Sequence, residues 1–356
     1  MRSPANSGRV LVTGGTGFLG RHLIELLTDG THEIGVLVRR DTDKSLWAGR
    51  AVIPLEADYD DAASLRRALT GVTVVFHLGA AVDDLDEETL DRGNVQATRA
   101  LSEACLQTGS RPPLFVYASS ISAAGPSTPG RPRTEEEPCR PVSAYGRSKL
   151  RAERLLQERG PALPSVILRL PNLIGEGQRQ LRTTMALVSR RIVPIPGNGD
   201  RQTSLCTATD AARALLLAAE RSPGRGEIYN VNDGGAYRWE DIVESLVRVL
   251  APGPVVRLRT PMLIAAAALM EAWAGIRKAA PRFSVHDVRN THRNYWVFDG
   301  SKFRRELGFE PTVALEPELK RIARAFRDEM RPPRKRNAPS APSPRLAREV
   351  QERVTS

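Results

Sequence analysis

The 356-residue chain contains few cysteines and few aromatic residues. Its three cysteines, Cys105, Cys139 and Cys206, lie far apart, and no Cys-x-x-Cys pair occurs. This spacing argues against a disulfide framework and against a structural zinc site, so we expect no bound metal. Aromatic residues make up 5% of the chain, and they form no cluster on which nucleic-acid bases would stack. A specific nucleic-acid partner is therefore not expected.

Long apolar runs are also missing. The first nine residues have no apolar core, which argues against a secretory signal and makes the cytoplasm the predicted location. Met262–Met270 is a run of nine apolar residues, followed by Glu271 and the apolar stretch Ala272–Ile276. A membrane-spanning helix needs roughly 18 apolar residues. We therefore expect a buried or groove-lining helix here, with contact to a membrane surface as the alternative.

The excess of basic residues is concentrated at the C-terminus. The net charge is +11, and residues 331–356 contribute +5 of it, from seven Lys/Arg and two Glu. Five prolines also lie in this segment, so we predict a disordered, basic, Pro-rich tail over 329–356. A solvated tail is the ordinary interpretation, and weak attraction to anionic lipid or RNA is the alternative.

Short apolar runs alternate with helical patterns over the first two thirds of the chain, which predicts an α/β fold. Strands are expected at 10–12, 34–38, 52–55, 72–78, 114–118, 166–170 and 228–231, and helices at 21–27, 61–69, 87–107, 145–159 and 210–220. Nearly all-apolar strands indicate a Rossmann doubly wound parallel sheet covered on both faces. We expect this NAD(P)-binding domain over 9–171 plus about 203–234. A smaller C-terminal substrate-binding lobe would comprise 172–202 plus 235–328.

A glycine-rich turn, Thr13–Gly20 (TGGTGFLG), joins the first strand to the first helix. Gly14 permits a tight turn, Gly17 lets the backbone approach a pyrophosphate, and Gly20 lets the helix pack closely on the sheet. Because strand, turn and helix occur in the required order, the motif predicts a dinucleotide-binding site.

The end of the second strand bears on the choice of cofactor. Val38 stands where a carboxylate would bind the ribose of NAD, and Arg39 and Arg40 follow it. Guanidinium groups suit a 2′-phosphate, so NADP is favoured and NAD is the alternative, although Asp41 weakens the signal. Asp58, after the third strand, is a candidate for the adenine amino group.

Tyr145 and Lys149 are four residues apart near the start of a helix, so both side chains lie on one helical face. A nearby ammonium lowers the pKa of a tyrosine, which would let Tyr145 act as a general acid or base. Ser120 ends the fifth strand, where substrates bind in such sheets, and is expected to donate a hydrogen bond to the reacting oxygen. Ser119 and Ser122 are competing candidates.

Further motifs occur in the order typical of one enzyme family. Beside the glycine turn they are the Asp58 region, Val75–Ala81 (VFHLGAA), Asn94-Val95, Tyr117–Ser120 (YASS), Tyr145–Lys149 (YGRSK), Leu168–Asn172 (LRLPN) and Arg305–Pro311 (RELGFEP). Over about residues 9–328 the chain resembles the extended short-chain dehydrogenases/reductases of the NAD-dependent epimerase/dehydratase superfamily. The resemblance implies a catalytic triad of Ser120, Tyr145 and Lys149. His77 is interpreted as structural.

The resemblance also implies how the cofactor is held, with Asn94 supporting the active site. The expected cofactor contacts are Gly14, Thr16, Gly17, Phe18, Leu19, Gly20, Arg39, Asp58, Tyr59, Gly79, Ala80, Ala81, Asn94, Tyr145, Lys149, Pro171 and Asn172.

Within the superfamily, Tyr117–Pro126 (YASSISAAGP) is similar to the corresponding stretch of 3β-hydroxysteroid dehydrogenases. Sugar-nucleotide epimerases usually carry Val-Tyr-Gly where Ala123–Gly125 stands, and an arginine for the nucleotide phosphates where Thr203 stands. Arg201 lies two residues earlier, and it is left open as a candidate to replace that arginine. A diphosphate without a positive clamp binds poorly, which disfavours a sugar nucleotide.

We therefore predict an NAD(P)-dependent oxidoreductase that moves a hydride between nicotinamide and a secondary alcohol or ketone of a hydrophobic, sterol-like substrate. The alternatives are a nucleotide-sugar epimerase or dehydratase and a non-catalytic NADP-sensing binder. The intact Tyr145/Lys149 pair argues against the sensor. The expected partner is a small molecule, while a homodimer and a weak membrane-surface contact stay open.

Overall fold

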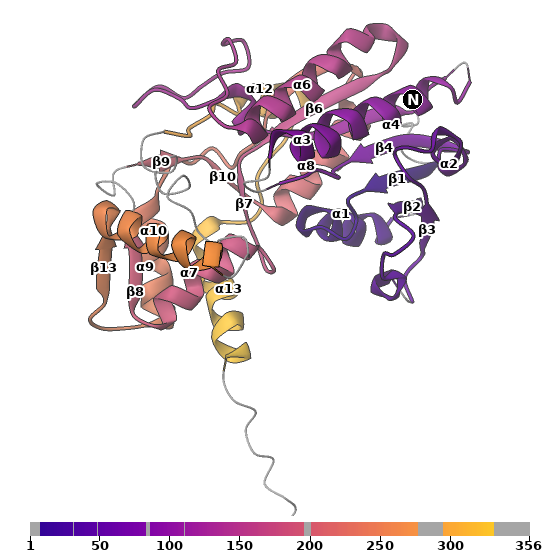
Figure 1. Ribbon diagram of the computed structural model, residues 1–356. Coiled ribbons are helices and arrows are strands. Elements are labelled where there is room, and N and C mark those ends of the chain that lie inside the picture. Colours follow the sequence, from indigo (N-terminus) through magenta and orange to yellow (C-terminus); the bar gives the residue numbers. More distant parts are fainter. Residues whose placement is uncertain are drawn as a thin grey trace, which may run out of the picture.

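The computed structural model describes residues 8–30, 32–47, 49–82, 86–109, 111–195, 201–276 and 295–330. Its centre is a sheet of seven strands in the order β11-β6-β5-β4-β1-β2-β3 (Figure 1). The strands are β1 (Arg9–Thr13), β2 (Glu33–Val38), β3 (Val52–Glu56), β4 (Val72–His77), β5 (Leu114–Ser120), β6 (Ser165–Leu170) and β11 (Arg225–Asn230). Every neighbouring pair is parallel. The strand order reverses between β1 and β4, which is where open α/β sheets bind ligands.

Helices cover both faces of the sheet, as its apolar strands require. On one face, α1 (Phe18–Thr28), α8 (Ala208–Arg221) and α12 (Ser301–Leu307) contribute to one buried apolar cluster. On the other, α2 (Ala62–Ala68), α4 (Ala97–Leu106) and α6 (Ala144–Arg159) contribute to a second. The predicted doubly wound parallel sheet is thus confirmed.

Side chains cap three of the six helices that cover the sheet. Asp61 caps α2, Ser143 accepts a hydrogen bond from the Gly146 amide at the start of α6, and Thr207 caps α8. Such caps satisfy amide groups that the first helical turn leaves without partners. Gly17 begins α1 with no side-chain cap and no acidic residue in the first turn. The amides of this turn therefore stay open to a ligand.

The single helix predicted over 87–107 is wrong in one respect. The structure has α3 (Glu87–Leu90), a wide π-helical turn η3 (Asp91–Gln96) and α4 in succession. A π turn keeps the helical direction but inserts an extra residue, so the apolar spacing hides it from the sequence. Asn94 lies in this turn, and its side chain is buried.

The smaller lobe has its own apolar core. Its buried residues come mainly from α7 (Arg179–Ser189), α9 (Trp239–Leu250) and α13 (Leu315–Glu329), with Val193 of β8 (Ile192–Ile195). Strand β13 (Val256–Arg259) pairs in parallel with β8 and is largely exposed. Besides the central sheet, the described residues form three short two-stranded sheets. These are β7 (Asn172–Ile174) with β10 (Leu205–Thr207), β9 (Gln202–Thr203) with β12 (Tyr237–Arg238), and β8 with β13. The remaining short elements are η2 (Lys44–Trp47), α5 (Ile121–Ala124) and η4 (Gly160–Ala162).

The apolar stretch of the lobe forms α10 (Thr260–Ile276). The expectation of a buried helix is wrong for much of its surface, because Met262, Leu269 and Trp273 are 52%, 73% and 56% exposed. A single stripe through Leu263 and Ala267 is buried instead. Among the described residues, no helix is long and apolar enough to cross a membrane.

The C-terminal boundaries differ in detail from the expectation. Phe303 and Leu307 of α12, with Phe309, pack into the core beneath the central sheet, although the sequence assigned them to the lobe. Glu329 still belongs to α13, and the rest of the predicted tail beyond Met330 lies outside the described residues.

Candidate active site and cofactor site

The glycine-rich turn is shaped so that only glycine fits at two positions. Gly14 has a φ of +69°, and a Cβ there would lie 2.7 Å from the Gly79 amide nitrogen. A Cβ on Gly20 would lie 2.2 Å from the Gly14 carbonyl oxygen. The turn is closed by a 2.9 Å hydrogen bond from the Gly17 amide to that same carbonyl. This packing brings the start of α1 against β1 and the loop after β4.

The turn offers an anion-binding surface. Thr16 and Gly17 are exposed, and Phe18 and Leu19 are half-buried behind them. Because α1 lacks a side-chain cap, its first amides and its helix dipole suit a diphosphate. The residues present therefore fit the pyrophosphate of a dinucleotide. Phe18 also leaves no room beside Gly175, where a Cβ would lie 2.8 Å from the ring.

The structure places the residues expected around the adenosine at the ends of β2 and β3. Val38 is buried, whereas Arg39 and Arg40 are exposed. Arg39 Nε lies 3.9 Å from Asp41 Oδ1, and both side chains are more than four-fifths exposed. Asp58 is exposed, and its carboxylate accepts a hydrogen bond from the Asp60 amide at 3.0 Å. The Asp58 carboxylate therefore stabilises the turn that contains it.

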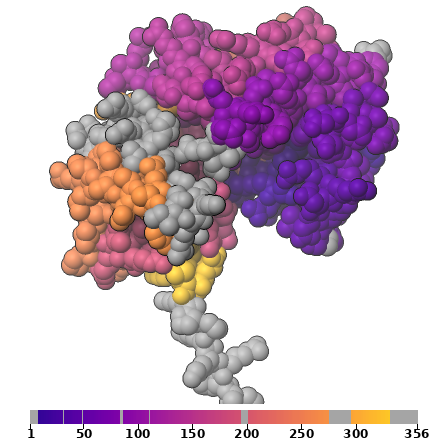
Figure 2. Space-filling view, in the orientation of Figure 1, coloured from indigo at the N-terminus to yellow at the C-terminus, as the bar shows by residue number. Residues whose placement is uncertain are grey.

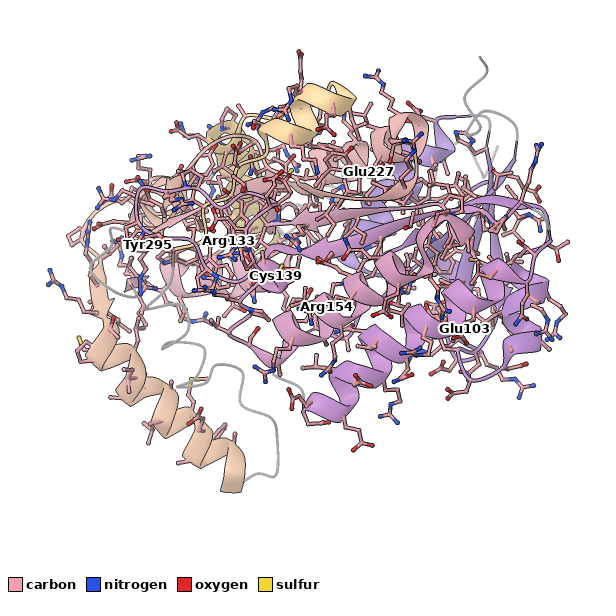
Figure 3. All side chains as sticks on the ribbon, turned by 90° about the horizontal axis from the view of Figure 1, so that it is seen from above. Glu103, Arg133, Cys139, Arg154, Glu227 and Tyr295 are labelled. Atoms are coloured by element: carbon pink, nitrogen blue, oxygen red, sulfur yellow. The ribbon has the colours of Figure 1, made fainter. Side chains whose placement is uncertain are left out.

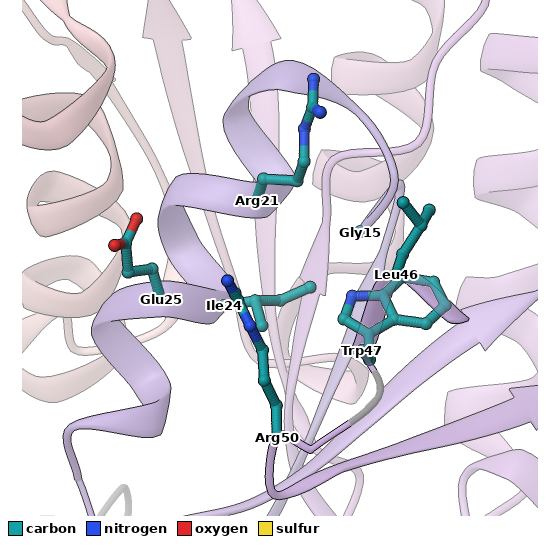
Figure 4. A pocket seen from close by; sticks show the side chains of 7 residues that line it. All are labelled: Gly15, Arg21, Ile24, Glu25, Leu46, Trp47 and Arg50. Carbon is teal, nitrogen blue, oxygen red and sulfur yellow. The ribbon is translucent and has the colours of Figure 1, made fainter. Parts of the chain in front are cut away.

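A pocket of about 220 Å³ lies beside the glycine-rich turn, between α1 and η2 (Figure 4). Its lining residues are Gly15, Arg21, Ile24, Glu25, Leu46, Trp47 and Arg50. Ligand pockets for small molecules typically measure about 300–1,000 Å³, so this space alone is too small for a dinucleotide. None of the three catalytic candidates lines it.

Behind the turn, a buried chain of hydrogen bonds crosses from β1 to η3. His77 is fully buried, and burial lowers its pKa to about 3, so the ring is neutral. Thr98 Oγ1 donates to the Asn94 carbonyl, so it accepts from His77 Nε2 at 3.0 Å. His77 Nδ1 then accepts from Thr13 Oγ1 at 2.8 Å. These contacts agree with a structural role for His77.

Thr13 also fixes the loop after β4. Its hydroxyl accepts from the Gly79 amide at 3.0 Å and is hydrogen-bonded to Tyr59, whose pKa burial raises to about 12. Gly79 and Ala80 are half-buried at this edge of the sheet. Thr13 therefore lies next to Tyr59 and Gly79, two of the predicted cofactor contacts, and Ala80 follows Gly79 in the same loop.

Asn94 ties that loop to the catalytic helix. Its Oδ1 accepts from the Ala81 amide at 2.8 Å, and its Nδ2 donates to the Ala81 carbonyl and to Ser148 Oγ. Ser148 Oγ in turn donates to the Tyr145 carbonyl at 2.8 Å. All of the polar atoms of the Asn94 amide are thus used to hold backbone and helix α6 in place.

The structure brings Ser120 and Tyr145 together. Ser120 ends β5 and begins α5, where its hydroxyl accepts from the Ser122 amide at 3.1 Å. The same hydroxyl lies beside the half-buried phenol of Tyr145, close enough to lower its pKa. Ser119, the first competitor, points the other way and bonds to Glu153. Ser122 contributes its backbone amide to the cap of α5.

The pKa of Tyr145 differs from the sequence-based expectation. A nearby ammonium was expected to lower it, but removal from water raises the pKa of Tyr145 to about 12, against the opposing effect of Ser120. Lys149 does not offset this rise. Its Nζ donates to the Ala118 carbonyl at 2.7 Å and lies 4.2 Å from the centre of the Tyr117 ring. Burial lowers the pKa of Lys149 to about 7, while Glu153 opposes that change.

A buried charged cluster behind the catalytic residues was missed by the sequence analysis. Glu153 and Arg169 form a fully buried ion pair at 2.7 Å. Arg169 also donates to the Cys139 sulfur at 3.1 Å, near the middle of the molecule in Figure 3. The sequence did contain a signal for Glu153. Four-residue intervals place Tyr145, Lys149 and Glu153 on one helical face.

The remaining site residues lie where the central sheet meets the lobe. Pro171 is buried, and Asn172 is exposed at the start of β7. Thr203 pairs with Tyr237, and its hydroxyl donates to the Ser204 carbonyl. Arg201 is only 9% exposed. Among the described residues, no group of three or more His, Cys, Asp or Glu is placed to hold a metal ion.

Comparison with known proteins agrees with this geometry. The model of the NAD dependent epimerase/dehydratase family matches residues 10–232. Ceramide reductase of Caulobacter vibrioides is 29% identical over 294 residues, which cover 82% of this chain and 86% of that protein. Human 3 beta-hydroxysteroid dehydrogenase type 7 is 28% identical over 346 residues, which cover 86% of this chain and 92% of that protein.

A solved structure also matches this chain over most of its length. MoeE5 in complex with UDP-glucuronic acid and NAD has a TM-score of 0.71 at 25% identity, covering 91% of this chain and all of that one. The parallel sheet and glycine turn define an NAD(P)-dependent oxidoreductase of the extended short-chain dehydrogenase/reductase class. With the family model matching more than half of its length, the chain belongs to the NAD-dependent epimerase/dehydratase family.

Proposed function

We propose that this oxidoreductase interconverts a ketone and a secondary alcohol on a hydrophobic, lipid-like molecule, with NADP(H) as its preferred cofactor. The observation that carries the proposal is that the Ser120 hydroxyl and the Tyr145 phenol lie next to each other at the end of β5. Two neighbouring hydroxyl groups can both turn to one carbonyl oxygen. A bound nicotinamide would supply or accept the hydride.

Tyr145 is the group that would move the proton. Because its pKa is raised to about 12, the phenol stays protonated at neutral pH, so it carries the proton that reduction of a carbonyl requires. When the carbonyl carbon accepts the hydride, the carbonyl oxygen would take the proton of Tyr145 Oη. Ser120 would donate a hydrogen bond to the same oxygen as its negative charge develops.

Lys149 would serve the proton balance of Tyr145. It lies one helical turn further along α6, and with a pKa of about 7 its amine can take up or release a proton near neutral pH. It also fits a role in holding the nicotinamide ribose, because its three donor sites exceed the one contact to the Ala118 carbonyl.

The proposed substrate class rests on relatives and on one missing charge. Ceramide reductase and 3 beta-hydroxysteroid dehydrogenase type 7 are named for lipid substrates. Where sugar-nucleotide enzymes usually have an arginine, this chain has Thr203, whose hydroxyl is already bonded to the backbone. The proposed preference for NADP rests on Arg39 and Arg40 and on the apolar Val38 at the end of β2.

Thermal unfolding with paired ligands tests the proposal. In the presence of NADP⁺, a panel of steroid and long-chain alcohols and ketones should raise the melting temperature, and UDP-glucose should not. Stabilisation by UDP-glucose with none by any hydrophobic ligand would favour the nucleotide-sugar alternative. The Tyr145→Phe variant is the matched control, since it keeps the ring and should retain ligand binding.

A further inference from the structure

Helix α10 presents an apolar surface to the outside of the molecule. Met262, Leu269, Met270 and Trp273 are 52%, 73%, 40% and 56% exposed, and we call them the α10 apolar face. The other exposed positions of the helix are Pro261, Ala265, Ala266, Ala268 and Ala272. An ordinary surface helix turns its polar side outward, and α10 does the reverse.

A narrow inner stripe holds the helix to the lobe. Leu263 and Ala267 are buried and pack with Leu258 of β13, and Ala274 is buried about two turns further on. Between Thr260 and Ile276 the single ionisable residue is Glu271, which is half-buried. The exposed face of α10 therefore carries no charge at all.

The position of α10 leaves this face accessible. In the space-filling view the helix, coloured orange, lies on the surface of the smaller lobe (Figure 2). Seen from above, it stands at the side of the molecule away from the central sheet (Figure 3). A contiguous apolar surface of this kind marks a contact with a protein or a membrane.

We infer that α10 docks the protein on the surface of a membrane that contains anionic lipids. A helix of 17 residues is about 25 Å long, and it fails the requirements of a spanning helix, so it would lie in the plane of the interface. Tryptophan is favoured at the headgroup boundary, and long apolar side chains would enter the acyl region beneath it.

Charge favours a membrane over a protein partner. Arg257 and Arg259 are exposed on β13, which leads directly into α10, and the chain as a whole carries +11. Cations beside an apolar face complement anionic headgroups. A protein interface would instead surround its apolar centre with polar groups of both signs, and α10 supplies Glu271 as its single ionisable residue.

This inference goes beyond the proposed function and does not rest on it. Binding to vesicles is measured without cofactor or substrate, so its failure leaves the oxidoreductase assignment unchanged. Conversely, a protein that binds vesicles but reduces no hydrophobic ketone would retain the docking surface.

Flotation of the full chain with vesicles tests the inference. We expect binding to phosphatidylcholine vesicles containing phosphatidylglycerol, and much weaker binding to phosphatidylcholine alone. The double variant Met262→Glu/Leu269→Glu should bind at least about tenfold more weakly, because each carboxylate would have to enter the interface. Val142→Glu is the control, because Val142 is also an apolar residue that is 43% exposed, and it lies just before α6 of the sheet domain.

A second readout keeps the test independent of folding. Lipids carrying bromine on their acyl chains should quench tryptophan fluorescence in the wild type, and Trp273→Phe should remove most of that quenching. Equal binding by the wild type and the double variant would overturn the inference. So would loss of binding on deletion of residues 331–356 alone, or self-association through α10 without vesicle binding.

Discussion

Replacing Lys149 by methionine should change how stability depends on pH. The side chain is 1% exposed, and burial lowers its pKa from 10.5 to about 7. Below pH 7 the folded protein must keep a buried ammonium. Between the two pKa values the unfolded chain binds more protons, so the free energy of unfolding rises with pH. Above both values the amine is neutral in either state.

The size of the effect follows from the same two values. At 1.36 kcal/mol for each pKa unit, the difference corresponds to an upper limit of about 5 kcal/mol. Lys149→Met removes this titration and loses one hydrogen bond to Ala118, worth about 1 kcal/mol at every pH. The variant should therefore gain stability relative to the wild type near pH 6, and the gain should shrink by at least about 2 kcal/mol toward pH 10.

Urea unfolding followed by circular dichroism at several pH values measures the difference. Lys302→Met is the control for the lost contacts, because Lys302 also donates to a backbone carbonyl and lies over a tyrosine ring, but is half-buried. If the stability difference between Lys149→Met and the wild type stays constant over this pH range, the pKa of Lys149 is not lowered in the folded protein.

Three further changes have defined outcomes. Glu153→Gln leaves the buried guanidinium of Arg169 without its counter-charge and should cost about 3–5 kcal/mol in urea unfolding; a loss below about 1 kcal/mol would contradict the ion pair. Gly20→Ala places a methyl group 2.2 Å from a backbone carbonyl, so cofactor affinity by calorimetry should fall at least about tenfold, and unchanged affinity would contradict the turn geometry. Arg39→Ser with Arg40→Ser should weaken NADP far more than NAD, and equal losses would contradict the proposed preference.

The sequence predicted the sheet and the cofactor turn because both depend on local patterns. Buried parallel strands consist of almost only apolar residues, and a turn that excludes every Cβ at Gly14 and Gly20 requires glycine. The spacing of Tyr145 and Lys149 also placed them on one helix, as observed. These features need no knowledge of distant contacts.

Other features depend on contacts that local patterns do not encode. The π turn at Asn94 keeps a helical spacing, so it was hidden within a predicted helix. Glu153 was overlooked because a charged residue in a helix is usually solvated, whereas here it is enclosed with Arg169. The pKa of Tyr145 could not be derived from spacing, since it is set mainly by burial of the phenol, which depends on the surrounding fold. Whether α10 is covered depends on the rest of the lobe.

Tyr145 is proposed to supply the proton in the reduction of a hydrophobic ketone. The most direct measurement is oxidation of NADPH by the wild type and by Tyr145→Phe with the ketone that stabilises the protein best. The variant should turn over about 10²–10⁴-fold more slowly while binding NADPH with unchanged affinity, since only the proton donor is lost. Turnover of Tyr145→Phe at the rate of the wild type would contradict the claim.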